Sequence, residues 1–239
     1  MTYIQGFVAA VPARNKDAYR NLAAKGAPMF KEYGATRVVE AWGDDITDGK
    51  VTDFKRAVNA ENGEVVVIGW WEYPSKSARD AANEKMMKDP RMKQFGADMP
   101  FDGKRMIFGG FQSIVDETGT GTPGYADGYV VPVPSGKKEA YRAIAAKSAD
   151  VFKEYGATRV VEAWGDDVPD GKVTDFKRAV KATADESVVF SFVEWPDKAT
   201  RDEGWKQVMK DPRMQPGPGE APFDGKRMFW GGFAPLLDE

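Results

Sequence analysis

The chain has 239 residues, of which 42% are apolar and 30% are charged, a balance typical of a globular protein rather than a disordered one. Its 34 basic and 37 acidic residues give a formal net charge of −3, so the basic excess of a dedicated nucleic-acid binder is missing. It contains no His and no Cys, which excludes disulfides, thiolate nucleophiles, His-dependent triads, and zinc or haem sites that use those residues.

The first third of the sequence predicts a strand, a helix and a second strand. Residues 2–11 have the composition of a strand. In 15–32, apolar residues recur at spacings of three and four, which indicates a helix, and Gly34 should end it. The run ATRVVEAWG at 35–43 predicts the second strand, followed by a loop rich in Asp and Gly.

The pattern continues with two further strands and one helix. Segment 51–58 fits either one helical turn, which Thr52 would cap, or an extended run. The third strand, 64–73, is nearly all apolar, so both of its faces should be covered. A second helix is expected at 75–88, with the Asp-Pro pair after it as its stop, and a fourth strand at 104–115.

The chain contains the same module twice. An offset of 122 aligns 3–117 with 125–239 without a gap, and 67 of the 115 aligned positions are identical. In 30–58, 27 of 29 positions match, which indicates either a shared buried core or a site used in both halves. We therefore predict a first module at 1–117, a Gly/Thr/Pro linker at 118–124 and a second module at 125–239.

The order of elements in each module predicts the fold. A β-α-β-β-α-β sequence is the ferredoxin-like pattern, and its two helices cover one face of the sheet. The other face needs a partner, and the second module is the obvious one. We expect an α+β fold in which two ferredoxin-like βαββαβ modules form an intramolecular, pseudo-dimeric α+β barrel.

Several long stretches carry a resemblance to a known family. FKEYGATRVVEAWGDD, DGKVTDFKRAV and KDPRM occur in both halves, and PFDGKRMIFGGF returns as PFDGKRMFWGGF. Each half thereby resembles the YbaA-like family of small bacterial proteins of unknown function. That family is similar in fold to the dimeric α+β barrels, which include cofactor-independent monooxygenases, decarboxylating or isomerising enzymes and haem-handling proteins. The resemblance implies this fold and a pairing of modules, and it supplies no catalytic residues.

Two Glu residues in each module are candidate proton-transfer groups. If the second and third strands are neighbours in a hairpin, Glu40 and Glu72 should lie near one another among aromatic side chains. An apolar wall and a second carboxylate both raise the pKa of a carboxyl group, which suits a general base or acid near neutral pH. The copies are Glu162 and Glu194. The alternative is that each Glu pairs with an Arg or Lys at a strand edge.

Basic side chains offer a second kind of site, a pocket for a carboxylate, a phosphate or a developing enolate. The candidates are Arg37, Lys55, Arg56, Lys104 and Arg105, with their copies Arg159, Lys177, Arg178, Lys226 and Arg227. The alternative is that these groups form ion pairs with neighbouring carboxylates. Asp44, Asp45 and Asp48 do not have the spacing of an EF-hand loop and are expected to form a solvated turn, so we predict no metal and no cofactor.

Aromatic side chains offer a third kind of site, a pocket for a flat apolar ligand. The principal candidates are Trp42, Trp70 and Trp164, with Trp71 and Phe108 among the other aromatics. The alternative is that they are half-buried strand residues. For the Met-rich stretch between residues 86 and 106, filling gaps in the core is the default interpretation.

Together these features indicate a metal- and haem-independent enzyme that abstracts a proton from, or oxygenates, a small organic molecule in a barrel pocket. The alternative is a non-catalytic protein, either ligand-binding or stress-associated. We expect a small-molecule ligand, no nucleic-acid partner, an internal pseudo-dimer and room for a further homodimer. No segment reaches about 18 apolar residues and the first residues lack a basic region, so we expect no membrane association and a cytoplasmic location.

Overall fold

The computed structural model describes residues 1–214 and 221–239. Its eight strands are β1 (Tyr3–Pro12), β2 (Arg37–Asp45), β3 (Glu64–Tyr73), β4 (Ile107–Thr118), β5 (Tyr125–Pro134), β6 (Arg159–Asp167), β7 (Glu186–Trp195) and β8 (Phe229–Asp238). Its α-helices are α1 (Lys16–Tyr33), α2 (Phe54–Ala57), α3 (Lys76–Lys88), α4 (Pro90–Ala97), α5 (Lys138–Glu154), α6 (Phe176–Ala179) and α7 (Lys198–Val208). Short 3-10 turns are η1 (Ala13–Asn15), η2 (Gly103–Arg105), η3 (Ser135–Lys137) and η4 (Pro212–Met214).

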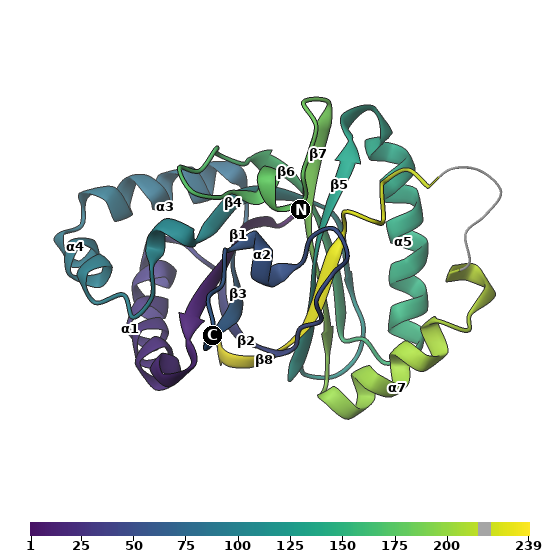
Figure 1. The fold of residues 1–239 in the computed structure, drawn as a ribbon, viewed down its shortest axis with the longest axis horizontal. Helices are drawn as coiled ribbons and strands as arrows, with labels where there is room; N and C mark the ends of the chain where they lie inside the picture. Colours follow the sequence, from purple (N-terminus) through teal and green to yellow (C-terminus); the bar gives the residue numbers. More distant parts are fainter. Residues whose placement is uncertain (215–220) are drawn as a thin grey trace.

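The strands close into one antiparallel barrel in the order β1-β3-β2-β8-β5-β7-β6-β4 (Figure 1). Within the first half, β1 pairs with β3 and β4, and β2 pairs with β3. The two halves join at two seams, where β2 pairs with β8 and β4 pairs with β6. The fourth strand of each half therefore pairs with the second strand of the other half, and the α+β fold with two repeated modules is confirmed.

Strand alternation separates an interior face from an exterior face. Apolar side chains from both halves fill the interior, and Trp70 of β3 stacks on Phe192 of β7 with ring centroids 4.2 Å apart. Because successive residues point to opposite faces, Trp71 points outward, towards the helices. The barrel interior is thus a packed core that both modules share.

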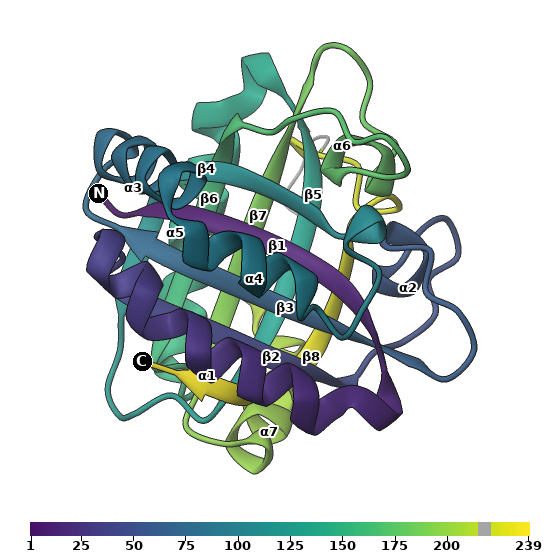
Figure 2. The ribbon, with the colours of Figure 1, turned by 90° about the vertical axis from the view of Figure 1, so that its left-hand side faces the viewer.

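The long helices lie outside the barrel on two opposite sides, with α1 and α3 on one side and α5 and α7 on the other (Figure 1). Figure 2 shows α1, α3 and α4 lying across the sheet formed by β4, β1, β3 and β2. On the other side, α5 packs against β4 and β6, and α7 against β7. Among residues 1–214 and 221–239, no helix is both long and apolar enough to cross a membrane.

The helix α3 ends at Lys88 with Asp89 as its C-cap, as expected. A further helix that was not expected, α4, begins at Pro90, because a proline at the first helical position loses no hydrogen bond. Two other local expectations need correction. Segment 51–58 contains the helical turn α2, and its cap is Asp53, whose carboxylate accepts a hydrogen bond from the backbone N–H of Arg56. The last strand of the first module begins at Ile107, after the 3-10 turn η2, rather than at residue 104.

Gly34 ends α1 as expected, with a φ of 124° that only glycine adopts without strain. Thr52 is not a helix cap. Its hydroxyl donates to the carbonyl oxygen of Ala179 in the second module, and Thr174 donates in the same way to Ala57. These two reciprocal bonds join the modules beside α2 and α6.

Candidate functional site

A cavity of about 680 Å³ lies between the outer face of the first module's sheet and its helices α1, α3 and α4. Apolar side chains make up most of its wall, and Met87 and Phe108, at 81% and 48% exposed, lie at its rim. The lining residues are Gln5, Phe7, Tyr19, Leu22, Ala23, Phe30, Glu40, Trp71, Arg79, Asn83, Met86, Met87, Phe95, Met99, Phe101, Met106, Phe108, Asp167 and Pro169. A cavity of this size and composition is suited to a small organic molecule.

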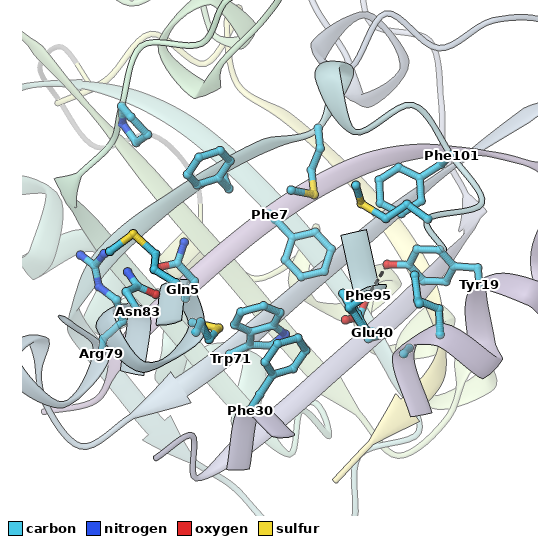
Figure 3. A pocket seen from close by; sticks show the side chains of 18 of the residues that line it. Gln5, Phe7, Tyr19, Phe30, Glu40, Trp71, Arg79, Asn83, Phe95 and Phe101 are labelled. Atoms are coloured by element: carbon cyan, nitrogen blue, oxygen red, sulfur yellow. Dashed lines mark hydrogen bonds between the residues drawn. The ribbon is translucent and has the colours of Figure 1, made fainter. Parts of the chain in front are cut away.

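Glu40 is a carboxylate in this apolar wall. It lies on β2, its side chain is directed outward, and only 4% of the residue is exposed. Tyr19, on α1, donates a hydrogen bond to Oε2 over 2.5 Å (Figure 3). Burial raises the pKa of Glu40 to about 7, and the Tyr19 hydrogen bond opposes that rise in part. Glu40 is therefore poised to exchange a proton near neutral pH.

Aromatic rings form the middle of the cavity. Trp71 stacks on Phe30 with ring centroids 3.9 Å apart, and Phe7 meets Trp71 edge-on at 6.0 Å. Gly69 makes this packing possible, because a Cβ at that position would lie 2.3 Å from the Phe7 ring. Figure 3 shows these rings between two polar ends.

The end of the cavity opposite Glu40 is also polar and contains Gln5, Arg79 and Asn83 (Figure 3). The second module reaches this end, since Asp167 of β6 accepts a hydrogen bond from Arg79 Nη2 over 2.8 Å. Arg79 also donates to the Tyr3 hydroxyl over 2.9 Å. The Gln5 Oε1 atom is buried without a hydrogen-bond partner among the described residues. An unpaired buried oxygen is costly, which favours a ligand donor at this end.

The predicted proximity of Glu40 and Glu72 is wrong, because the two side chains lie on opposite faces of the sheet. Glu40 pairs across the ladder with Gly69, and Arg37 pairs with Glu72, three residues further along β3. An odd separation reverses the face. Glu72 therefore points inward with Trp70, whereas Glu40 points towards the helices.

Glu72 and Glu194 belong to an ion-pair network at one end of the barrel. Arg37 donates to Glu194 of the other module over 2.9 and 2.5 Å, and Arg159 donates to Glu72 over 2.7 and 3.0 Å. Asp238 and Asp116 take further hydrogen bonds from the same two Arg side chains. For these two Glu residues, pairing with Arg is the interpretation that the structure confirms.

Glu162, the copy of Glu40, has a different set of partners. It accepts hydrogen bonds from Tyr141, over 2.7 Å, and from Ser191. Gly69 occupies the position of Ser191 in the first module, so Glu40 lacks this second hydroxyl donor. Burial raises the pKa of Glu162 as well.

The other basic candidates lie outside the cavity and are mostly engaged with carboxylates. Lys55 contacts Asp48 over 2.9 Å, and Arg105 makes a bidentate pair with Glu64 over 2.7 Å at both contacts. Lys104 is exposed. Their neighbours and copies follow the same pattern, with the ion pairs Arg56–Asp53, Lys177–Asp170, Arg178–Asp175 and Arg227–Glu186 and with Lys226 beside the Asp224 turn.

The three principal Trp candidates do not line the cavity. Trp70 lies inside the barrel against Phe192. Trp42 and Trp164 are 8% and 7% exposed and carry Lys16 and Lys138, respectively, over their rings at 5.3 and 5.4 Å. Trp71 is the Trp residue that lines it.

Only part of this lining was predictable from the amino-acid sequence. The Met-rich stretch was the available signal, because Met86, Met87, Met99 and Met106 all line the cavity. Gln5, Arg79 and Asn83 have no sequence signature, since only the placement of α3 over β1 brings them together.

The family described as "Protein of unknown function (DUF1428)" matches this chain twice, at residues 2–103 and 124–225. The uncharacterized protein YbaA of Escherichia coli K12 is 68% identical over 117 residues, which are 49% of this chain and 100% of YbaA, and the Shigella flexneri protein of that name matches equally.

Solved structures with the same fold cover the whole chain at low identity. A candidate monooxygenase from Lactobacillus acidophilus has a TM-score of 0.57 at 12% identity, over 100% of this chain and 96% of its own. An anthrone oxidase-like protein has a TM-score of 0.53 at 11% identity, over 100% and 92%. At these identities the likeness establishes the fold alone. The two family matches together span most of the sequence, and the chain is a tandem member of the DUF1428 family, to which each half belongs.

Proposed function

We propose that the chain is an enzyme that removes a proton from a small, largely apolar carbonyl compound bound in the first module's cavity. The observation that carries the proposal is the position of Glu40, a buried carboxylate with a pKa of about 7 in the wall of an apolar cavity of about 680 Å³. A base with this pKa is substantially ionised at neutral pH and still accepts a proton effectively.

The groups around Glu40 suit proton abstraction next to a carbonyl. The Tyr19 hydroxyl donates to Oε2 and holds the carboxylate in place. The Trp71 indole N–H lies beside the Glu40 carboxylate and, like the Tyr19 hydroxyl, lowers the pKa of Glu40. In the proposed reaction this N–H donates to the developing enolate oxygen once Glu40 has taken up the proton. A donor aimed at developing negative charge in a dry site stabilises it far better than water does.

The enolate formed in this way has two outcomes, return of the proton at carbon or reaction with dioxygen. A substrate with an aromatic ring next to the reacting carbon would stack between Phe7, Phe30 and Trp71. The low-identity neighbours with monooxygenase-like and anthrone oxidase-like descriptions support the oxygenation route in fold only. Both routes begin with the same step at Glu40.

Anthrone, a flat ketone with an acidic CH₂ group, is a suitable probe. Glu40 would take a proton from the CH₂ carbon, and the electron pair would move to the carbonyl oxygen. Dioxygen would then add at the carbon that lost the proton. Loss of water from the resulting hydroperoxide gives anthraquinone, so that one anthrone and one dioxygen yield one anthraquinone and one water. Anthraquinone absorbance and oxygen uptake report this reaction, and deuterium uptake in D₂O under nitrogen reports the proton step alone.

Glu40→Gln and Glu162→Gln form a matched pair for the test, since they change the same position in the two modules. We expect Glu40→Gln to lower the anthrone rate by at least about 100-fold, the usual contribution of a general base, and Glu162→Gln to leave it near the native rate. Equal rates in the native chain and Glu40→Gln would contradict the proposal. Saturable anthrone binding without turnover would favour a non-catalytic ligand-binding protein.

We also propose that modules 1–117 and 125–239 are ferredoxin-like units and form an internal pseudo-dimer across linker 118–124. The strand orders β4-β1-β3-β2 and β8-β5-β7-β6 support this, because they correspond under the repeat. Native mass spectrometry tests whether the chain is self-sufficient: a mass of 26.4 kDa is expected, and twice that mass would mean that chains pair further.

A further inference from the structure

The two modules differ at the positions that surround the cavity. Asn83 of the first module corresponds to Trp205 of the second, and Gln5 corresponds to Asp127. Trp71, whose ring forms one wall, corresponds to Val193. In a chain whose halves are identical at 67 of 115 positions, these replacements change volume and charge at one place in the fold.

Among the described residues of the second module, the Trp205 ring lies where Asn83 borders the cavity in the first. Its ring contacts Phe152 with centroids 5.2 Å apart and stacks on Trp230 at 5.6 Å. The counterparts of these two rings, Phe30 and Phe108, both line the cavity of the first module. The Trp205 indole thus contacts both Phe152 and Trp230. In the first module, the cavity separates the corresponding rings, and Asn83 takes the place of the indole.

A buried carboxylate holds Trp205 in this position. Asp127 is 0% exposed and accepts a hydrogen bond from the Trp205 indole N–H over 2.8 Å. The Trp195 indole and the Arg201 guanidinium also donate to Asp127, over 2.9 and 2.6 Å. These donors satisfy the hydrogen-bonding capacity of the buried Asp127 carboxylate and hold the Trp205 ring in one position. A network with unpaired members would not hold it in this way.

The first module lacks this anchor. Gln5 occupies the position of Asp127, and its Oε1 has no hydrogen-bond partner within the described residues. Arg79, the copy of Arg201, pairs with Asp167 of the second module, just as Arg201 pairs with Asp45 of the first, but it has no carboxylate at position 5 to bind. Because Asp167 also lines the cavity, the second module contributes to the first module's site.

We infer that each chain binds one ligand, in the first module, and that the residue at position 83 or 205 decides whether a module is open. The ligand is an uncharged, flat aromatic molecule. Aromatic rings line the middle of the cavity, and at one end Asp167 neutralises the charge of Arg79. At the same end Gln5 Oε1 is an acceptor without a donor among the described residues, so a ligand N–H or O–H would pair with it. This inference rests on the cavity used in the proposed function and makes no use of Glu40 chemistry.

N-phenyl-1-naphthylamine, a neutral aromatic amine whose fluorescence rises in apolar surroundings, is the probe for this inference. We expect the native chain to bind one dye molecule at saturation. The substitution N83W should weaken binding by at least about tenfold, because an indole would enter the cavity at the place that the Trp205 ring takes in the second module. The control N83A removes the same side chain but keeps the cavity open, so it should bind the dye at least about tenfold more tightly than N83W.

A second variant tests the other module. W205N should raise the number of dye sites from one to two, provided that thermal unfolding shows a folded chain. A folded W205N chain that still binds one dye would contradict the role of position 205. The N83W and N83A pair decides the inference even if W205N does not fold.

Three results would overturn the inference: two dye sites in the native chain, no saturable dye binding, or equal affinities in N83W and N83A. Dye binding needs no turnover, so it distinguishes this inference from the proposed function. If Glu40→Gln keeps the native anthrone rate while N83W loses dye, only the proposed function fails. If Glu40→Gln loses activity while N83W keeps dye affinity, only the one-site inference fails.

Discussion

Arg37 of the first module donates two hydrogen bonds to Glu194 of the second, with Nη1–Oε2 and Nη2–Oε1 distances of 2.9 and 2.5 Å. Arg159 and Glu72 repeat this pairing in the opposite direction. Each module thus supplies the partner for a carboxylate buried in the other, which connects the folding of the two halves.

Removing Arg37 should therefore destabilise the whole chain. The Glu194 side chain is 2% exposed, so Arg37→Ala would leave a buried charge with weaker compensation. Loss of one partner of a buried ion pair costs about 3–5 kcal/mol, and we expect a loss near the lower end in urea unfolding. Arg20→Ala, which breaks an exposed pair with Asp17, should change stability by less than about 1 kcal/mol. Similar effects in the two variants would contradict the account.

Glu40 should make stability depend on pH. Burial raises its pKa from 4.5 to about 7, so between these values the folded chain holds a proton that the unfolded chain releases. The contribution of Glu40 to the free energy of unfolding has its full value below about pH 4.5. It falls by about 3 kcal/mol in total as the pH rises to about 7.

Urea unfolding of the native chain and Glu40→Gln between pH 4 and pH 8 measures this effect. We expect the free energy of unfolding of Glu40→Gln, relative to that of the native chain, to rise by about 3 kcal/mol from pH 4 to pH 8. Parallel pH profiles for the two proteins would show that Glu40 titrates in its ordinary range.

Gly69 should be essential for the shape of the cavity. A Cβ at this position would lie 2.3 Å from the Phe7 ring, so Gly69→Ala must displace that ring. We expect a destabilisation of about 1–3 kcal/mol and weaker binding of N-phenyl-1-naphthylamine. Ser191→Ala, at the same position in the second module, is the control and should leave dye affinity unchanged. An unaltered affinity in Gly69→Ala would mean that Phe7 does not shape the site.

Gly34 should be needed for the end of α1. Its φ of 124° is a conformation that side chains other than glycine adopt with strain. Gly34→Ala is expected to cost about 1 kcal/mol, or about 2–4 °C in Tm. Gly96→Ala in α4, where a Cβ meets nothing within 4 Å, should instead be neutral or slightly stabilising. Calorimetry that ranks the two variants in the opposite order would contradict this interpretation.

Local pattern and repetition predicted most of the strands and the long helices, because period-two and period-3.6 signals and the 122-residue offset are properties of the chain itself. The cross-strand register was not accessible. For that reason Glu40 and Glu72 were expected to lie near one another, although the Glu40–Gly69 pairing places them on opposite faces of the sheet. The Asp-Pro pair was correctly taken as the end of α3, but α4 was missed, since proline both follows helices and begins them.

The candidate site was only partly predictable. Glu40 was identifiable as a candidate proton-transfer group, whereas its hydrogen bond from Tyr19 was not predicted. The cavity itself depends on how α3 and α4 cover the sheet, and the sequence carries no direct signal for that placement. The difference between Asn83 and Trp205 is visible in the sequence, but its meaning appears only once the Trp205 ring is seen to lie where Asn83 borders the cavity.

The most direct test of the account is a ¹³C NMR titration of the Glu side-chain carboxyl groups, with the Glu40 signal assigned by its absence in Glu40→Gln. We expect a pKa of about 7 for Glu40, rising further when N-phenyl-1-naphthylamine fills the cavity and removes water from the carboxylate. A Glu40 pKa near 4.5 that does not respond to the dye would contradict the central claim that this carboxylate is a base in a ligand-binding cavity.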